Sequence, residues 1–532
     1  MKTPASAVEV LEARIAPATL SPAGTLLTYT DIDGDLVKIT FTQAIEPIKF
    51  GFDTGSVNGD STTPQEITFI DLTGKTGIGL TLTAAKQAGK GDSHANIEKL
   101  NGLGTDLGAI RIDGDLHEID CGDAGHVGIG LKSLTVLSMG RADSGVADSD
   151  MADIGTLHVK GSIGNTHLIF TTAQSIVVDG SLLATGGVNS AYIQASGDVT
   201  NLKIGGSMIA ADSPGQGGCV VVSGDLKTFT LGGSMLGGTV VASNTQFLVN
   251  GSLGTATIKG SLVGRAADGG GAMEVDKDLK SITIGGSVIG GTGNLSGSIV
   301  CLGTDGIGSV RIAHDLLGGE SNRSVAISEN GAILSEVGRI GSITIGGSFV
   351  GGYDTSGHGF TQSGMISAHT TIGAVSIGNL RGTTDRHVVI EAAGTSNVTA
   401  IASVTVKGSM TFADIFAGYE RDLTAGNFDS GIGKVTVGGD FIQSRIVAGT
   451  TDGGDGTLGD GGTDNVASLI ATIQSVKIAG EANARPGTNI YFNIEAPFFL
   501  KFQLGKAIYT HAELLAGFFV GSQQHVGVNS YF

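Results

Sequence analysis

Three aspartates at alternate positions, Asp31, Asp33 and Asp35, bring three carboxylates close together in the chain. Carboxylate oxygens are preferred ligands of Ca²⁺, so this spacing could serve a calcium site. The segment does not follow the EF-hand pattern, because Gly34 is misplaced and Thr42 stands where that loop has a bidentate Glu. Two interpretations remain, a plain acidic turn and a calcium site, and the sequence predicts no other cofactor.

A second cluster of metal-ligand types comprises His117, Cys121 and His126, with Asp120 and Asp123 among them. Such side chains bind zinc, but structural zinc sites follow regular spacings that this cluster does not match. If the segment is a strand, alternation also divides these side chains between its two faces. We therefore predict no metal site in this segment.

One repeated sequence motif indicates the secondary structure that would position such residues. It is a run of β-branched residues that ends in Gly-Gly-Ser or a close variant. It reads Ser-Ile-Thr-Ile-Gly-Gly-Ser at 281–287 and again at 342–348. A small polar residue marks the end of each phrase, 26 to 33 residues after the previous one. These markers are Ser181, Ser207, Ser234, Ser261, Ser287, Asp315, Ser348, Asn379, Ser409 and Asp440. Alternation at period two predicts strands, and the glycines predict tight corners.

This repeat favours an all-β fold, a parallel β-helix or β-solenoid in which each repeat forms one coil and each strand pairs with its counterpart in the next coil. Leucine-rich repeats would need a leucine framework, and WD propellers carry Trp, of which this chain has none. We expect a right-handed solenoid. Ile284, in the repeated phrase, should then be buried in a stacked apolar row.

Four segments follow from this interpretation. Residues 1–19 form a tag, residues 20–96 a small β-domain, residues 97–488 the β-helix, and residues 489–532 an aromatic-rich tail with a helical turn near 511–517. Strands in the small domain are predicted near residues 26–30, 36–42, 67–72 and 79–83. An open solenoid end exposes unpaired strand edges, so the tail is predicted to be a cap or, alternatively, an assembly surface.

Composition limits the partners. The net charge of −19 would repel a phosphate backbone, so nucleic acid is not an expected partner. No stretch approaches the roughly 18 apolar residues of a membrane helix, and residues 1–18 lack the apolar core of a secretory signal. The cysteines, Cys121, Cys219 and Cys301, give no disulfide framework and are predicted to be buried in strands.

The start of the chain carries a resemblance to a known group of proteins. Residues 8–18 read Val-Glu-Val-Leu-Glu-Ala-Arg-Ile-Ala-Pro-Ala, residues 29–40 read Tyr-Thr-Asp-Ile-Asp-Gly-Asp-Leu-Val-Lys-Ile-Thr, and residues 101–116 read Asn-Gly-Leu-Gly-Thr-Asp-Leu-Gly-Ala-Ile-Arg-Ile-Asp-Gly-Asp-Leu. These segments resemble the Leu-Glu-x-Arg segment and β-strand repeats of surface and secreted proteins from planctomycete and verrucomicrobial bacteria. The resemblance departs at Ala13, where Pro or Asp is common. It implies a sorting tag and an extracellular or cell-surface location.

Two function classes remain open. The first is a non-catalytic extracellular structural or adhesive protein, such as a surface-layer, fibre or stalk component, which would associate with itself or with a cell-surface polysaccharide. The alternative is a polysaccharide-degrading lyase or hydrolase, which would need acids and bases on consecutive coils. Gly357-His358-Gly359 is similar to part of the polygalacturonase motif, but its paired aspartates are missing, and Asp354 and Asp385 are the nearest acids.

The Gly-Asp run at 452–460 is interpreted as a flexible loop, because Leu458 stands where a calcium-binding repeat needs Asp.

Overall fold

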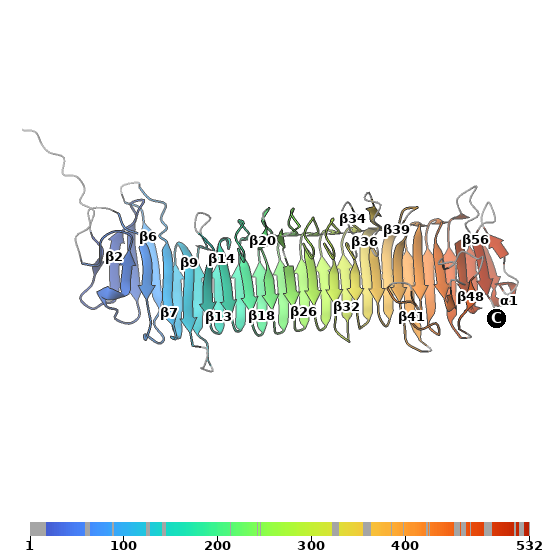
Figure 1. Cartoon of the computed structure of the whole chain (residues 1–532), viewed down its shortest axis with the longest axis horizontal. Coiled ribbons are helices and arrows are strands. Elements are labelled where there is room, and N and C mark those ends of the chain that lie inside the picture. Colours follow the sequence, from blue (N-terminus) through green and yellow to red (C-terminus); the bar gives the residue numbers. More distant parts are fainter. Residues whose placement is uncertain are drawn as a thin grey trace, which may run out of the picture. The chain divides into compact units, whose positions relative to one another are not determined.

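The chain is a β-solenoid of about 14 turns, with 54% of residues in strands and 2% in helices, which confirms the predicted fold class. The computed structural model describes residues 17–58, 64–87, 90–123, 128–140, 145–212, 214–241, 243–244, 246–321, 329–354, 363–384, 386–396, 398–421, 424, 426–451, 458, 464–468, 470–483, 492–514, 518–520 and 526–530. Contacts divide the chain into two compact units, Met1–Asp179 and Gly180–Phe532. In each unit, strands stack as successive coils (Figure 1).

The first unit begins with antiparallel strands. In one sheet β1 (Thr19–Leu20), β2 (Leu26–Thr30), β3 (Leu36–Phe41) and β6 (Leu80–Ala85) pair in antiparallel order, and parallel pairing then continues through β8 (Leu107–Ile112), β10 (Leu131–Val136), β13 (Ile154–Val159) and β15 (Ala173–Val178). The other sheet runs β4 (Phe50–Phe52), β5 (Ile67–Asp71), β7 (Ile97–Leu103), β9 (Asp115–Gly122), β12 (Ala147–Met151) and β14 (Thr166–Phe170). The strands predicted in residues 20–96 are therefore present, and they pair directly with the first coils.

Most strands of the second unit belong to three parallel stacks. The first stack is β18 (Val199–Ile204), β22 (Leu226–Leu231), β26 (Leu253–Ile258), β29 (Leu279–Ile284), β32 (Ile307–Ile312), β36 (Ile340–Val350), β39 (Ile372–Arg381), β41 (Thr399–Val406), β44 (Gly431–Val437), β49 (Thr472–Ile478) and β53 (Lys501–Leu504). After the Gly-Ser corner comes a short stack: β16 (Leu182–Leu183), β19 (Met208–Ile209), β23 (Met235–Leu236), β27 (Leu262–Val263), β30 (Val288–Ile289), β33 (Leu316–Leu317), the ends of β36 and β39, β42 (Met410–Thr411), β45 (Phe441–Ile442) and β50 (Ala482–Asn483).

The third stack of this unit is β17 (Tyr192–Ala195), β21 (Val220–Val222), β25 (Gln246–Val249), β28 (Ala272–Val275), β31 (Ile299–Cys301), β35 (Ile333–Ser335), β38 (Met365–Ala368), β40 (Val388–Ala392), β43 (Ala413–Ala417), β46 (Arg445–Ala448) and β51 (Phe492–Ala496). Short strands in the connections pair with one another as β20 (Gly215–Gln216) with β24 (Ser243–Asn244), β34 (Glu320–Ser321) with β37 (Tyr353–Asp354), and β47 (Thr450–Thr451) with β48 (Asn465–Val466). Each coil thus contributes one strand to each stack.

The core follows the strand alternation. Ile258, Ile284 and Ile312 occupy equivalent positions in successive coils and are fully buried, whereas Thr283 beside them is exposed. The predicted burial of Ile284 is confirmed, and with it the register. Cys121, Cys219 and Cys301 are also buried, as predicted.

The polar markers at the corners explain the repeat. In the second unit the side chain at each marker from Ser181 to Asp440 is hydrogen-bonded to the corresponding residue one coil later. We call this row the corner ladder; its members are the ten markers named above and Glu481. At most steps a hydroxyl or carboxylate oxygen accepts the next backbone amide, at 2.7 to 3.2 Å. The step from Ser348 to Asn379 runs between side chains instead, at 3.4 Å.

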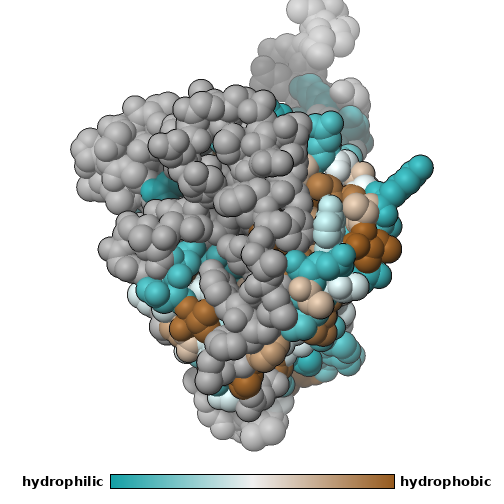
Figure 2. Space-filling view, turned by 90° about the vertical axis from the view of Figure 1, so that its right-hand side faces the viewer, coloured by the Kyte–Doolittle hydropathy of each residue, from teal (hydrophilic) through white to brown (hydrophobic). Residues whose placement is uncertain are grey.

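The C-terminal part of the second unit returns to antiparallel pairing. After β53 stacks on β49, the chain turns back as β54 (Ala507–Thr510), followed by α1 (His511–Leu514), β55 (Phe518–Val520) and β56 (Val526–Ser530). Phe499 and Phe502 are fully buried there, while Leu500 and Ile508 are about half exposed. In the view onto this end, apolar and hydrophilic described residues lie side by side (Figure 2). Among the residues that the structure describes, no helix is both long and apolar enough to cross a membrane.

Candidate functional sites

The three aspartates form the turn between β2 and β3. Asp31 Oδ1 accepts the backbone amides of Gly34 at 3.0 Å and Asp35 at 2.7 Å, which closes the turn. Gly34 has a positive φ of 103°, a conformation that glycine adopts without strain. One carboxylate oxygen from each of Asp31, Asp33 and Asp35 lies within 4.8 Å of the others, and within the described part of the chain no other such group of three metal-ligand side chains occurs.

Residues 91–94 fold over this turn. The backbone amide of Asp92 donates to Asp33 Oδ2 at 3.0 Å, and that of Ser93 donates to Asp35 Oδ2 at 2.6 Å. Gly91 is packed so closely that a Cβ there would lie 1.9 Å from Asp35 Oδ1. The segment and the turn are therefore held together through carboxylate oxygens.

The environment of the turn disfavours uncompensated negative charge. Burial, together with hydrogen bonding and charge from Asp33, raises the pKa of Asp31 to about 7. Asp35 is fully buried, and its Oδ1 has no hydrogen-bond partner. A cavity of about 210 Å³ adjoins the turn, lined by Tyr29, Asp31, Asp33 and residues of the 92–96 segment. The predicted acidic cluster is therefore brought together, in a setting that could accept a cation.

A second group of charged residues lies on the outer face of the first unit. Lys99 on β7 contacts both Glu118 and Asp120 on β9, the latter at 2.7 Å. Desolvation of the ammonium would lower the pKa of Lys99, but the two carboxylates raise it overall. On β12, Asp148 pairs with His167 Nδ1 at 3.0 Å. These residues contribute to an open cavity of about 670 Å³ lined by Lys99, His117, Glu118 and Asp148, among others.

Within the described residues, the His and Cys side chains of the 117–123 segment do not gather around one point. Cys121 is buried in the core, in register with Met151, and burial raises the pKa of its thiol to about 12. Asp120 instead lies on the outer face, where its Oδ1 accepts the amide of Asp150 at 3.2 Å. His126 lies outside the described residues.

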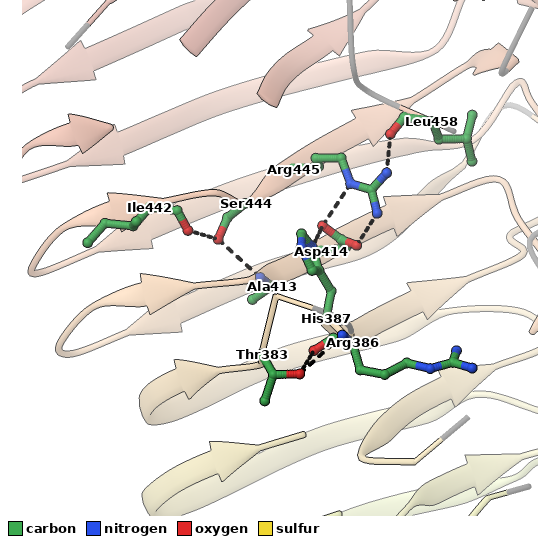
Figure 3. A network of polar contacts seen from close by, with 9 residues as sticks. All are labelled: Thr383, Arg386, His387, Ala413, Asp414, Ile442, Ser444, Arg445 and Leu458. Carbon is green, nitrogen blue, oxygen red and sulfur yellow. Dashed lines mark hydrogen bonds and ion pairs between the residues drawn. The ribbon is translucent and has the colours of Figure 1, made fainter. Parts of the chain in front are cut away.

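A buried polar network joins three coils of the second unit (Figure 3). Asp414 on β43 accepts from Arg445 Nε on β46 at 3.0 Å and is 2.9 Å from His387 Nδ1. Arg445 also lies over the ring of Phe416, 5.3 Å from its centroid, and donates to the carbonyl of Leu458. Burial of Asp414 would raise its pKa, but Arg445 and His387 together hold the pKa below its usual range.

The sequence interpretation missed this network, although a signal was present. His387, Asp414 and Arg445 are 27 and 31 residues apart, each about one coil, so the repeat places them in neighbouring coils. Ionic groups in neighbouring coils neutralise one another here, and the geometry indicates a structural role.

Other predicted segments carry no site in the described residues. Gly357-His358-Gly359 and Asp385 lie outside them, as does the run at 452–460 apart from buried Leu458. Asp354 lies in β37.

Comparison with known proteins gives no relative: no family model, no curated protein and no solved structure matches the chain.

Proposed function

We propose that the protein is a non-catalytic structural or adhesive component of a bacterial cell surface. The observation that carries the proposal is the corner ladder, in which the recurring polar side chains of the second unit bond to the next coil. Side chains used in this way fasten each coil to the next, as a protein with a structural role requires. The resemblance of residues 8–18 to a sorting tag supports the location.

The proposal is tested on cells that produce the protein. Antibodies against the purified chain should label intact cells, and protease added outside should remove the signal while a cytoplasmic marker persists. The purified protein should form fibres or lattices visible by negative-stain electron microscopy, or bind polysaccharide from the same cells. Labelling only after permeabilisation, with no assembly and no polysaccharide binding, would refute the proposal.

One observation favours a second candidate, a polysaccharide-degrading enzyme. Cys121 and Met151 are in register on neighbouring strands, and Glu118 and Asp148 lie three residues before them. The carboxylates of Glu118 and Asp148 therefore belong to neighbouring coils. Both side chains line the open cavity that also contains Lys99 and His117. Retaining glycosidases use two carboxylates about 5 to 5.5 Å apart, one as the acid and one as the nucleophile.

The two candidates differ in one measurement. The purified chain is incubated with a panel of acidic and neutral polysaccharides, and new reducing ends and unsaturated products are measured. Turnover that disappears in both Glu118→Gln and Asp148→Asn would establish the enzyme. Unchanged substrates, or turnover that both variants retain, would exclude this site as catalytic.

A further inference from the structure

We propose that the turn between β2 and β3 binds a Ca²⁺ ion through the carboxylates of Asp31, Asp33 and Asp35, and that the ion fastens residues 91–94 to this turn. This inference is independent of the proposed function. It concerns one end of the first unit, where antiparallel strands precede the parallel coils.

The oxygen geometry fits the ion. Ca²⁺ binds oxygen at about 2.3 to 2.6 Å, so two ligands on opposite sides of it lie about 4.6 to 5.2 Å apart. The three carboxylate oxygens here lie within 4.8 Å of one another. Mg²⁺ requires a near-ideal octahedron and loses its water reluctantly, whereas Ca²⁺ accepts irregular sets of carboxylate oxygens.

The fully buried carboxylate of Asp35 is the observation that points to a ligand. Its Oδ2 accepts the amide of Ser93, but its Oδ1 is buried and has no hydrogen-bond partner. A buried carboxylate oxygen without a donor is costly unless a cation compensates it. Bound Ca²⁺ would provide that compensation, while Asp33, which is exposed, supplies an accessible ligand.

The remaining coordination positions have a source. The adjoining cavity reaches Asp31 and Asp33 and is large enough for water molecules, which complete most calcium shells. Because the amides of Asp92 and Ser93 donate to Asp33 and Asp35, an ion that fixes these two carboxylates also fixes the segment that covers them.

The experiment uses terbium, which replaces calcium and luminesces when a nearby tyrosine is excited. Tyr29 lines the same cavity, and the chain has no Trp, so Tyr29 is the expected sensitiser. The full chain should show Tb³⁺ emission that Ca²⁺ displaces and Mg²⁺ displaces far less. Asp33→Asn should weaken Ca²⁺ binding about tenfold or more, because it removes one of three charged ligands at an exposed position. Glu98→Gln, which removes an exposed charge elsewhere in the same unit, is the matched control.

Two further measurements separate binding from its consequence. Ca²⁺ that binds only the folded chain should raise its melting temperature, and Tyr29→Phe should abolish the emission yet keep this rise. Trypsin cleavage after exposed Lys90 should slow when Ca²⁺ is added to the wild type and not when it is added to Asp33→Asn. Emission that Ca²⁺ does not displace, equal affinity in Asp33→Asn and Glu98→Gln, or cleavage at Lys90 that ignores Ca²⁺ would overturn the proposal.

Discussion

The backbone amide of Ser234 donates to Oγ of Ser207, one coil earlier, at 3.0 Å. Ser234 in turn accepts the amide of Ser261 at the same distance. Each serine therefore receives one hydrogen bond in its side chain and gives one from its backbone. A corner residue with a short side-chain oxygen is needed in every coil to continue the row, which explains why the phrase ends in Ser, Asp or Asn.

Removing one step of the corner ladder should weaken the second unit measurably. Ser234→Ala deprives the Ser261 amide of its acceptor, and we expect a loss of about 1 kcal/mol in the free energy of unfolding. Ser281→Ala, at a half-exposed serine on β29, is the control and should cost less. Urea denaturation followed by circular dichroism measures both. If both variants lost the same free energy of unfolding, the hydrogen bond of the corner ladder would contribute nothing measurable to stability.

Glycine precedes every marker except Asp315, which follows His314, and the packing at position 233 gives a steric reason. A Cβ at position 233 would lie 2.2 Å from Ser207 Oγ and 2.8 Å from the carbonyl oxygen of Gly206. Gly233→Ala should therefore destabilise the second unit more than Ser234→Ala does. In a Ser207→Ala background the added cost should fall without vanishing, because the clash with Oγ is gone and the clash with the backbone remains. Thermal denaturation of the four proteins of this cycle gives the coupling, and strict additivity would contradict the steric explanation.

The sequence was sufficient to predict the coils and their register because both depend on local periodicity. Ile284 and the strands of residues 20–96 could be placed from alternation alone. Alternation could not predict which residues on the outer face of the strands are buried. Val300, Leu334 and Met365 alternate with core residues, yet they are buried in a separate cluster that also involves Leu295. Such burial depends on which connections cover a strand from outside, and periodicity carries no information about that.

The candidate sites were predictable to different degrees. Asp31, Asp33 and Asp35 are close in sequence, so a turn suffices to gather them. Asp414 and Arg445 meet only because their coils are in register, and that alignment requires counting residues through insertions of variable length. The contact of the 91–94 segment with the aspartate turn has no sequence signal, since it joins positions almost 60 residues apart.

The Asp414 network should make the second unit sensitive to acid. Arg445 and His387 hold the folded-state pKa of Asp414 below its unfolded value of about 3.9, so the stabilisation is fully present above that pH and is lost as pH falls through the folded pKa. Asp414→Asn should lower stability at pH 7 by about 1 to 3 kcal/mol and should flatten the decline below pH 4. Asp305→Asn, at an exposed position, should change neither the stability at pH 7 nor its decline below pH 4. Unfolding curves between pH 2.5 and 7 test this, and parallel pH profiles for wild type and Asp414→Asn would contradict it.

The C-terminal strands could act as a cap or as an assembly surface, and these two roles predict different results when the strands are deleted. β53 stacks in parallel on β49 and is then covered by antiparallel β54, so the tail occupies the edge of the last coil. If it acts as a cap, deletion of residues 489–532 should expose this edge and cause aggregation of a solenoid whose circular dichroism is otherwise retained. If it is instead an assembly surface, the deletion should leave soluble monomers and abolish fibres or lattices.

Ile508→Lys separates the roles without removing the strand, since Ile508 is 54% exposed and a charge there should block assembly while leaving the melting temperature unchanged. A deleted chain that stays monomeric when dilute, shows no exposed strand edges and still assembles normally when concentrated would exclude both roles.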